Sequence, residues 1–289
     1  MGLNRDFIGT EYKSEIDICG EDVIAYASAI GAQNLKYINN NEHSDIAPAC
    51  FSVTYELPLI YKLLSDSELH GGDDERQKNM LMLVHGDQYF KFYSPISSGD
   101  KITFKAEISD IEDKGSGEVL KIHLLSINQD GDKVVESDWG LFIRGIGSGK
   151  RPQSRGLKPE SASDHQEILF RHSIKIPLDI THKYSKASND MNPIHLDNEV
   201  AKRAGLPGIV VHGLCTMAMT SEGIIKSYLD NNSSDVVSLG VRFSAPVFPG
   251  DELEIEGSKT SEESKLAFHV VRKSDGIKVI RDGTLEVKI

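Results

Sequence analysis

The sequence predicts an α+β fold built from two related halves, each with a long helix packed on a curved antiparallel sheet. The first observation is a repeat: residues 90–104 (FKFYSPISSGDKITF) match residues 241–255 (VRFSAPVFPGDELEI). Phe92 matches Phe243, and both segments place a Pro-x-x-x-Gly-Asp turn between alternating apolar and polar stretches. The second observation is that a short helix, a longer apolar helix and a run of strands follow in this order twice.

Each element is predicted from its local pattern. Short helices are expected over residues 21–30 and 178–188, and longer apolar helices over residues 49–64 and 213–229. A long helix of this kind buries its apolar stripe on the inner face of a curved sheet. Alternating residues predict the strands, because successive side chains of a strand point to opposite faces. The expected strands are residues 80–92, 101–110, 119–128 and 133–144 in the first half, and residues 236–243, 252–259, 265–273 and 277–287 in the second.

The boundary between the halves is visible in the composition. Residues 147–164 are polar and rich in Gly, Ser and Pro, so they cannot bury enough apolar surface to fold alone. We therefore expect an N-terminal domain over residues 1–146, a linker over 147–164 and a C-terminal domain over 165–289.

The bulk composition excludes several classes of protein. With 39% hydrophobic and 26% charged residues, the 289-residue chain resembles an ordinary globular protein. Its formal net charge of −12 disfavours nucleic acid or an anionic membrane as a partner. Three separated cysteines give neither a disulfide framework nor a metal-ligand spacing. No signal peptide, membrane span or Ser-Lys-Leu ending is recognisable, so we expect a cytosolic (cytoplasmic) protein. We also expect no metal and no cofactor.

The segment most informative about chemistry is YSKASNDMNPIH, residues 184–195. Proline lacks an N–H and restricts the residue before it, so the chain must turn at Asn192 and Pro193. The turn can aim Asp190 and His195 at one point, although on a straight helix they would diverge. The amide of Asn192 is placed to hold the loop or a bound water.

A carboxylate and an imidazole that face one water suit the addition of water to an activated double bond. Their titrations are coupled, so the sequence does not decide which of Asp190 and His195 is the base. Gly213 is expected near the N-terminus of the second long helix, where free N–H groups favour an oxyanion. His212 is expected to be a structural hydrogen-bond donor. In the first half, Ala32 and Tyr37 occupy the matching positions and cannot move protons in this way.

The segments NDMNPIHLDNEVAKRAGLPGIVVHGLCTM and VRFSAPVFPGDEL resemble the MaoC-like hydratases of the (R)-specific enoyl-CoA hydratase 2 type. The first half, through LVHGDQYFKFYSPISSGD and DIEDKGSG, resembles the non-catalytic half of the two-domain members, such as the hydratase unit of the multifunctional β-oxidation enzyme type 2. The resemblance implies a double hot-dog fold. The family signature begins with Gly where this chain has Asn189, for which we expect an altered loop geometry rather than lost activity.

The resemblance also implies roles for particular residues. It makes Asp190 and His195 the catalytic pair, Asn192 their support and Gly213 the oxyanion donor. The implied substrate-binding residues are His85, Gly86, Lys114, Asp190, Met191, Asn192, Pro193, Ile194, His195, Gly213 and Phe243.

The expected function is (R)-specific hydration of trans-2-enoyl-CoA to (3R)-3-hydroxyacyl-CoA in fatty acid metabolism, with dehydration as the reverse. The alternatives are a 3-hydroxyacyl-ACP dehydratase, a hot-dog thioesterase and a non-catalytic acyl-CoA-binding module. The expected partner is an acyl-CoA or acyl-carrier-protein thioester, with no nucleic acid and no membrane. The chain itself is either a monomer that imitates a dimer or a homodimer.

Overall fold

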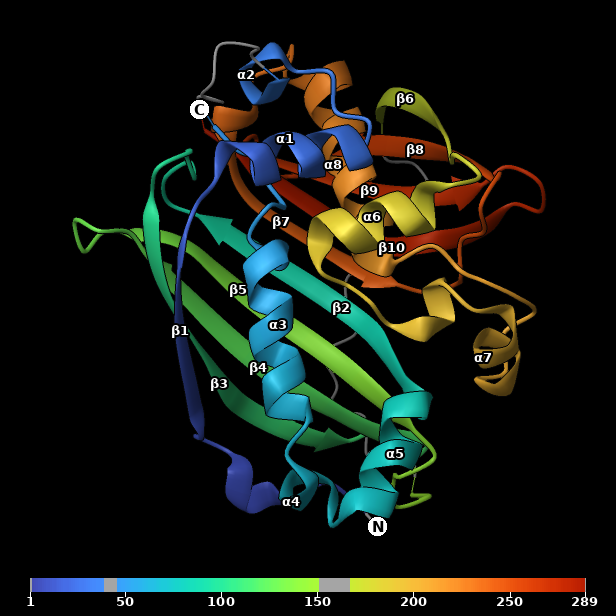
Figure 1. The fold of residues 1–289 in the computed structure, drawn as a ribbon. Helices are drawn as coiled ribbons and strands as arrows, with labels where there is room; N and C mark the ends of the chain where they lie inside the picture. Colours follow the sequence, from blue (N-terminus) through green and yellow to red (C-terminus); the bar gives the residue numbers. More distant parts are fainter. Residues whose placement is uncertain (1, 39–45, 151–166, 289) are drawn as a thin grey trace.

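In the computed structural model, which describes all residues except 1, 39–45, 151–166 and 289, ten strands form one antiparallel sheet (Figure 1). Their order across the sheet is β1-β3-β4-β5-β2-β7-β10-β9-β8-β6. The strands are β1 (Glu11–Asp17), β2 (Leu83–Phe92), β3 (Lys101–Asp113), β4 (Gly117–Ile127), β5 (Lys133–Arg144), β6 (Ile168–Lys175), β7 (Val236–Phe243), β8 (Glu252–Lys259), β9 (Lys265–Arg272) and β10 (Ile277–Val287).

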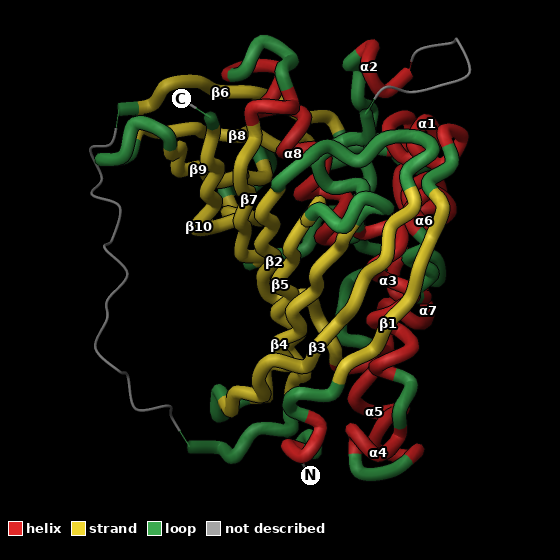
Figure 2. The backbone as a smooth tube through the Cα atoms, turned by 90° about the vertical axis from the view of Figure 1, so that its left-hand side faces the viewer, coloured by secondary structure: helices red, strands yellow, loops and turns green. Residues whose placement is uncertain are grey.

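The helices gather on one side of this sheet (Figure 2). They are α1 (Gly20–Ala29), α2 (Leu35–Ile38), α3 (Val53–Leu64), α4 (Ser67–His70), α5 (Asp73–Met82), α6 (Ile180–Ser188), α7 (Asn198–Arg203) and α8 (Gly213–Tyr228), with short 3₁₀ turns η1 (Arg5–Phe7), η2 (Pro193–His195) and η3 (Ser233–Asp235). Among the described residues, no helix combines the length and apolarity that a bilayer span requires.

The two halves meet at the middle of the sheet, where β2 pairs with β7. Tyr89 lies opposite Gly240, and these two residues directly precede the two repeated segments. The pairing therefore places the repeat's two-fold relationship at the β2–β7 seam. The predicted linker, residues 147–164, falls mostly outside the described residues, so its structure is not tested.

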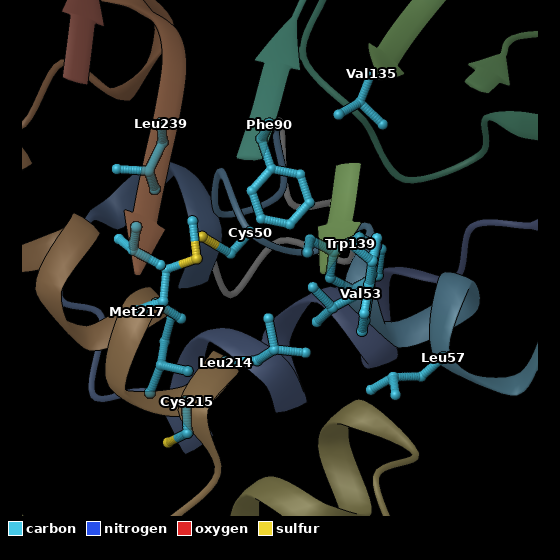
Figure 3. Packing of buried hydrophobic residues seen from close by; sticks show 14 of the residues in the cluster. Cys50, Val53, Leu57, Phe90, Val135, Trp139, Leu214, Cys215, Met217 and Leu239 are labelled. Atoms are coloured by element: carbon cyan, nitrogen blue, oxygen red, sulfur yellow. The ribbon is translucent and has the colours of Figure 1, made fainter. Parts of the chain in front are cut away.

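One hydrophobic core spans both halves. Figure 3 shows side chains of α3 (Val53, Leu57) and α8 (Leu214, Met217) packed together beneath Phe90 of β2 and Leu239 of β7. Both long helices are buried along most of their length, which the apolar stripes predict. Residues of both helices also line a cavity to which both halves contribute.

Several elements differ from expectation. The strand predicted from residue 80 begins at Leu83, because residues 80–82 complete α5, whose first turn carries the acidic Asp73, Asp74 and Glu75. The edge strands β1 and β6 and the helices α2, α4, α5 and α7 are additional elements, and the first long helix begins at Val53 rather than at residue 49. The four strands β5, β7, β8 and β10 have the predicted bounds.

Candidate active site

The turn predicted at Asn192 and Pro193 is present. α6 ends at Ser188, and its C-cap residue Asn189 takes a left-handed conformation with φ 62°. The side chain of Asn192 then accepts a hydrogen bond from the N–H of Ile194 (3.3 Å) and caps η2. Asparagine tolerates the left-handed conformation better than most residues, so Asn189 can occupy the position of the signature's glycine. The altered loop geometry expected there stays a prediction.

The turn brings Asp190 and His195 together. The two residues are buried, with exposed fractions of 7% and 8%. A ligand atom from each, together with one from His212, lies within 4.8 Å of the others. Asp190 and His195 both line a cavity of about 370 Å³. The predicted juxtaposition is confirmed, whereas the catalytic roles remain predictions.

The hydrogen bonds of His195 define its tautomer. Its Nδ1 lies 2.8 Å from the carbonyl oxygen of Val210, which can only accept, so Nδ1 carries the hydrogen. Burial lowers the pKa of His195, and the nearby Asp190 carboxylate opposes this shift. A neutral imidazole with this tautomer has its free lone pair on Nε2.

Asp190 receives two donors on one oxygen. The hydroxyl of Tyr61 donates to Oδ1 (2.8 Å), and the N–H of Asn192 donates to the same atom (3.2 Å). Oδ2 has no hydrogen-bond partner within the described part of the chain. Tyr61 belongs to α3 of the N-terminal half and is absent from the predicted site. The sequence gives no signal for it, because it lies 129 positions from Asp190 in an apolar helix.

His212 contacts both members of the Asp190–His195 pair. Its ring stacks on that of His195, and its Nε2 lies 3.2 Å from the carbonyl oxygen of Asp190 and 3.1 Å from Oγ of Ser185. The expectation that His212 is a structural donor is therefore confirmed. The ring planes of the two histidines differ by 28°.

α8 begins at Gly213, as predicted, and the first N–H groups of a helix have no partner inside it. Gly213 lines the same cavity as Asp190 and His195. A Cβ atom at this position would lie 3.3 Å from the ring of Phe243, tighter than most real contacts. Glycine therefore keeps room between the helix start and the cavity wall, where an oxyanion could accept from backbone N–H groups.

The remaining cavity wall comes from both halves and is mostly apolar. The N-terminal half contributes Leu57, Ile60, Tyr61, Leu64, Leu83, Val84, His85, Trp139, Leu141 and Arg144. His85 stacks on Trp139 at 4.9 Å between centroids and meets Phe243 edge-on at 5.1 Å. Burial lowers the pKa of His85 to about 4, so this ring is neutral in the cavity wall near pH 7.

A bulge at Gly86 explains why His85 faces the cavity. The β2–β5 register shifts between His85 and Asp87, and a bulge redirects the side chains on one side of it. Asp87 accordingly faces the opposite side, where it lines a groove with Lys114. That groove also contains His85, Gly86 and Phe243, so it adjoins the cavity.

The other predicted substrate-binding residues are placed differently. Lys114 lies in this outer groove rather than in the cavity, and its ammonium is paired with Glu112. Asn192 and Ile194 line the cavity. Met191, which is 58% exposed, and the exposed Pro193 lie in the same loop but do not line it.

Among its described residues, which leave out 39–45, the matching region of the N-terminal half holds no comparable site. Ala32 and Tyr37 are both buried. The pocket there is bordered by residues 92–96, the counterparts of residues 243–247, but its volume is only about 60 Å³. This half has no carboxylate and imidazole pair at these positions.

Two family models match adjoining parts of the chain. The MFE-2 hydratase 2 N-terminal domain matches residues 18–145, and the MaoC like domain matches residues 161–279. Together they cover most of the sequence.

Similar curated proteins carry related names. A probable enoyl-CoA hydratase 2 of Dictyostelium discoideum is 26% identical over 286 residues, which cover 93% of this chain and 90% of the relative. The peroxisomal multifunctional enzyme type 2 of Drosophila melanogaster is 26% identical over 285 residues. The match covers 97% of this chain, which spans only 47% of that longer protein.

Solved structures confirm the fold. A MaoC-like dehydratase from Phytophthora capsici has a TM-score of 0.82 at 24% identity and covers 99% of this chain and 98% of its own. A Mycobacterium tuberculosis protein with a double hot-dog fold has a TM-score of 0.62 at 11% identity, with 97% and 96% covered. The predicted α+β double hot-dog is thus correct. The MFE-2 hydratase 2 N-terminal domain and the MaoC like domain are thus matched in this order along one chain, in agreement with the resemblance seen in the sequence.

Proposed function

We propose that the protein is a hydro-lyase that adds water to trans-2-enoyl-CoA to give (3R)-3-hydroxyacyl-CoA, and catalyses the reverse dehydration, in fatty acid metabolism. One observation carries the proposal: Asp190 and His195 meet in a buried cavity beside the start of α8. The family and the names of its members support the same reaction.

The proposed chemistry uses atoms whose other contacts are known. A water between Oδ2 of Asp190 and Nε2 of His195 donates one hydrogen to each, since both are acceptors. As the water oxygen bonds to C3, one of its protons moves to this pair, and the pair delivers a proton to C2. The other water hydrogen stays on the new hydroxyl. Which of the two groups takes the proton is left open.

During the addition, negative charge develops on the thioester oxygen as an enolate. The N–H of Gly213 and the positive end of α8 are suited to stabilise it. Such a preorganised donor is often worth about 2.7–4 kcal/mol of transition-state stabilisation.

We assign the two halves different tasks. Residues 165–289 carry the acid and the imidazole, whereas residues 1–146 supply the apolar wall formed by Leu57, Ile60 and Leu64. An acyl tail in the cavity would lie against this wall. The thioester handle, either CoA or a carrier-protein arm, would then leave by the outer groove beside His85, Gly86 and Lys114.

The test is to incubate the protein with crotonyl-CoA and decenoyl-CoA and to follow the loss of the conjugated enoyl absorbance. Chiral analysis of the product should give the (3R) alcohol. Release of free CoA would instead indicate a thioesterase, and binding without turnover would indicate an acyl-CoA-binding module. Faster reaction of the acyl-carrier-protein thioester would make the protein a 3-hydroxyacyl-ACP dehydratase.

A cytosolic location remains our prediction, and the peroxisome is the alternative because relatives carry that word in their names. Fractionation of the native cells with an antibody to the chain separates the two. One chain contains both walls of the cavity, so a monomer can be complete. Light scattering in solution distinguishes it from a homodimer.

A further inference from the structure

The N-terminal half holds the catalytic loop by two hydrogen bonds from α3. The Tyr61 hydroxyl donates to Oδ1 of Asp190 (2.8 Å), and Nδ2 of Asn189 donates to the carbonyl oxygen of Thr54 (3.0 Å). Pro58 makes the second bond possible, because a proline has no N–H to donate to the carbonyl four residues before it. Asn189 and Asp190, which are adjacent in the loop, are therefore both hydrogen-bonded to α3 of the N-terminal half.

The bond from Tyr61 is placed to affect chemistry rather than packing alone. Tyr61 lines the cavity, so its hydroxyl lies at the reacting end of Asp190. Because Tyr61 and the N–H of Asn192 both occupy Oδ1, they fix the rotation of the carboxylate and leave Oδ2 for water. Burial and the Asp190 charge both raise the pKa of Tyr61, so the phenol keeps its proton and stays a donor.

We propose that Tyr61 is a positioning residue for the hydration reaction and holds Asp190 with Oδ2 toward the reacting water. The inference rests on the proposed function and extends it across the β2–β7 seam. The half that has no catalytic pair of its own thereby contributes to the catalytic pair of the other half.

The test is the Tyr61→Phe variant, which keeps the ring and removes only the hydroxyl. Loss of a hydrogen bond to a charged group should lower kcat for crotonyl-CoA about tenfold to one-hundredfold, with KM changed less than about twofold. The matched control is Tyr55→Phe, on the same helix, whose buried hydroxyl bonds to Oγ of Ser126 (3.1 Å). Tyr55 does not line the cavity, so this variant should keep kcat near that of the wild type.

The split between kcat and KM separates positioning from packing. A misplaced Asp190 carboxylate lowers kcat and leaves substrate binding intact, whereas a loosened cavity wall raises KM as well.

The outcomes are distinguishable. A folded Tyr61→Phe protein with wild-type kcat, or one whose KM rises as much as its kcat falls, overturns the role of Tyr61 while the hydratase assignment stands. An equal loss of kcat in Tyr55→Phe also overturns it, because the effect would then come from α3 as a whole. A wild-type protein that hydrates no enoyl thioester contradicts the proposed function itself and removes the inference with it.

Discussion

The imidazole rings of His195 and His212 stack with their centroids 3.7 Å apart. Two charged imidazoles at this separation would repel each other. Burial lowers the pKa of His212 well below its ordinary value, and the neighbouring His195 lowers it further. His212 is therefore neutral at physiological pH, and its Nε2–H can serve as a fixed donor to the Asp190 carbonyl.

The first prediction concerns this donor. His212→Phe keeps an aromatic ring against His195 but removes the hydrogen bond to the Asp190 backbone. We expect kcat to fall about tenfold, which corresponds to roughly 1.4 kcal/mol, with little change in KM. Steady-state kinetics with crotonyl-CoA check it against His182→Phe, an exposed position on α6. If the two variants keep equal activity, His212 does not support the loop.

The catalytic pair gives the second prediction. Asp190→Asn and His195→Gln should each lower kcat about 10²-fold to 10⁴-fold, because each removes one positioned proton-transfer group. Circular dichroism and thermal unfolding should show an intact fold in both. Near-normal turnover in either variant would remove that residue from the mechanism.

Much of the fold follows from local pattern. Strands β8 and β9 alternate between buried and more exposed positions along nearly their whole length, and the sequence predicts their bounds to within one residue. The edge strand β1 has no buried residue, and β6 has one, so their alternation carries almost no hydrophobic signal. The sequence pattern therefore does not predict the two edge strands.

The residues of the site, too, are only partly predictable from local sequence pattern. Asp190 and His195 are five positions apart, and one proline between them is enough to predict that they meet. Tyr61 is different, since its contact with Asp190 depends on how two halves dock, and no local pattern encodes docking. The redirection of His85 depends on a bulge in a pairing between distant strands and is equally invisible in the sequence.

Asn189 gives a prediction about stability. Its left-handed backbone costs an alanine about 1–2 kcal/mol, and the bond from its amide to Thr54 contributes about 1 kcal/mol. Asn189→Ala should therefore lower the free energy of unfolding by about 2–3 kcal/mol. Asn189→Gly, which accepts the conformation, should lose less. Urea unfolding measures both, and equal losses would mean that the backbone is not strained.

Lys114 gives a prediction about the substrate handle. Lys114→Ala should raise KM for crotonyl-CoA, by about twofold to fivefold because Glu112 already neutralises part of the charge. KM for the N-acetylcysteamine thioester, which has no nucleotide, should not change. The control is Lys91→Ala, an exposed lysine of β2 outside the groove. An unchanged KM for the CoA thioester would exclude Lys114 from binding.

A buried acid behind the cavity wall leads to the last prediction. Glu56 of α3 is fully buried and accepts hydrogen bonds from Oγ of Ser137 (2.6 Å) and Nε1 of Trp139 (2.9 Å). Through Trp139 it fixes a side chain that lines the cavity and stacks on His85. Burial raises its pKa from 4.5 to about 7, although both donors oppose the shift.

Between pH 4.5 and 7 the folded protein therefore binds more of this proton than the unfolded chain, so the contribution of Glu56 to stability falls as pH rises. The slope is about 1.4 kcal/mol per pH unit, or about 3 kcal/mol over the whole window. Glu56→Gln removes the titration, so the wild type should lose about this much stability relative to the variant between pH 4.5 and 7. Urea unfolding of both proteins across the range measures the difference. A difference that stays constant with pH would mean that Glu56 titrates alike in the folded and unfolded chains, and that the carboxylate is stabilised in the core despite its burial.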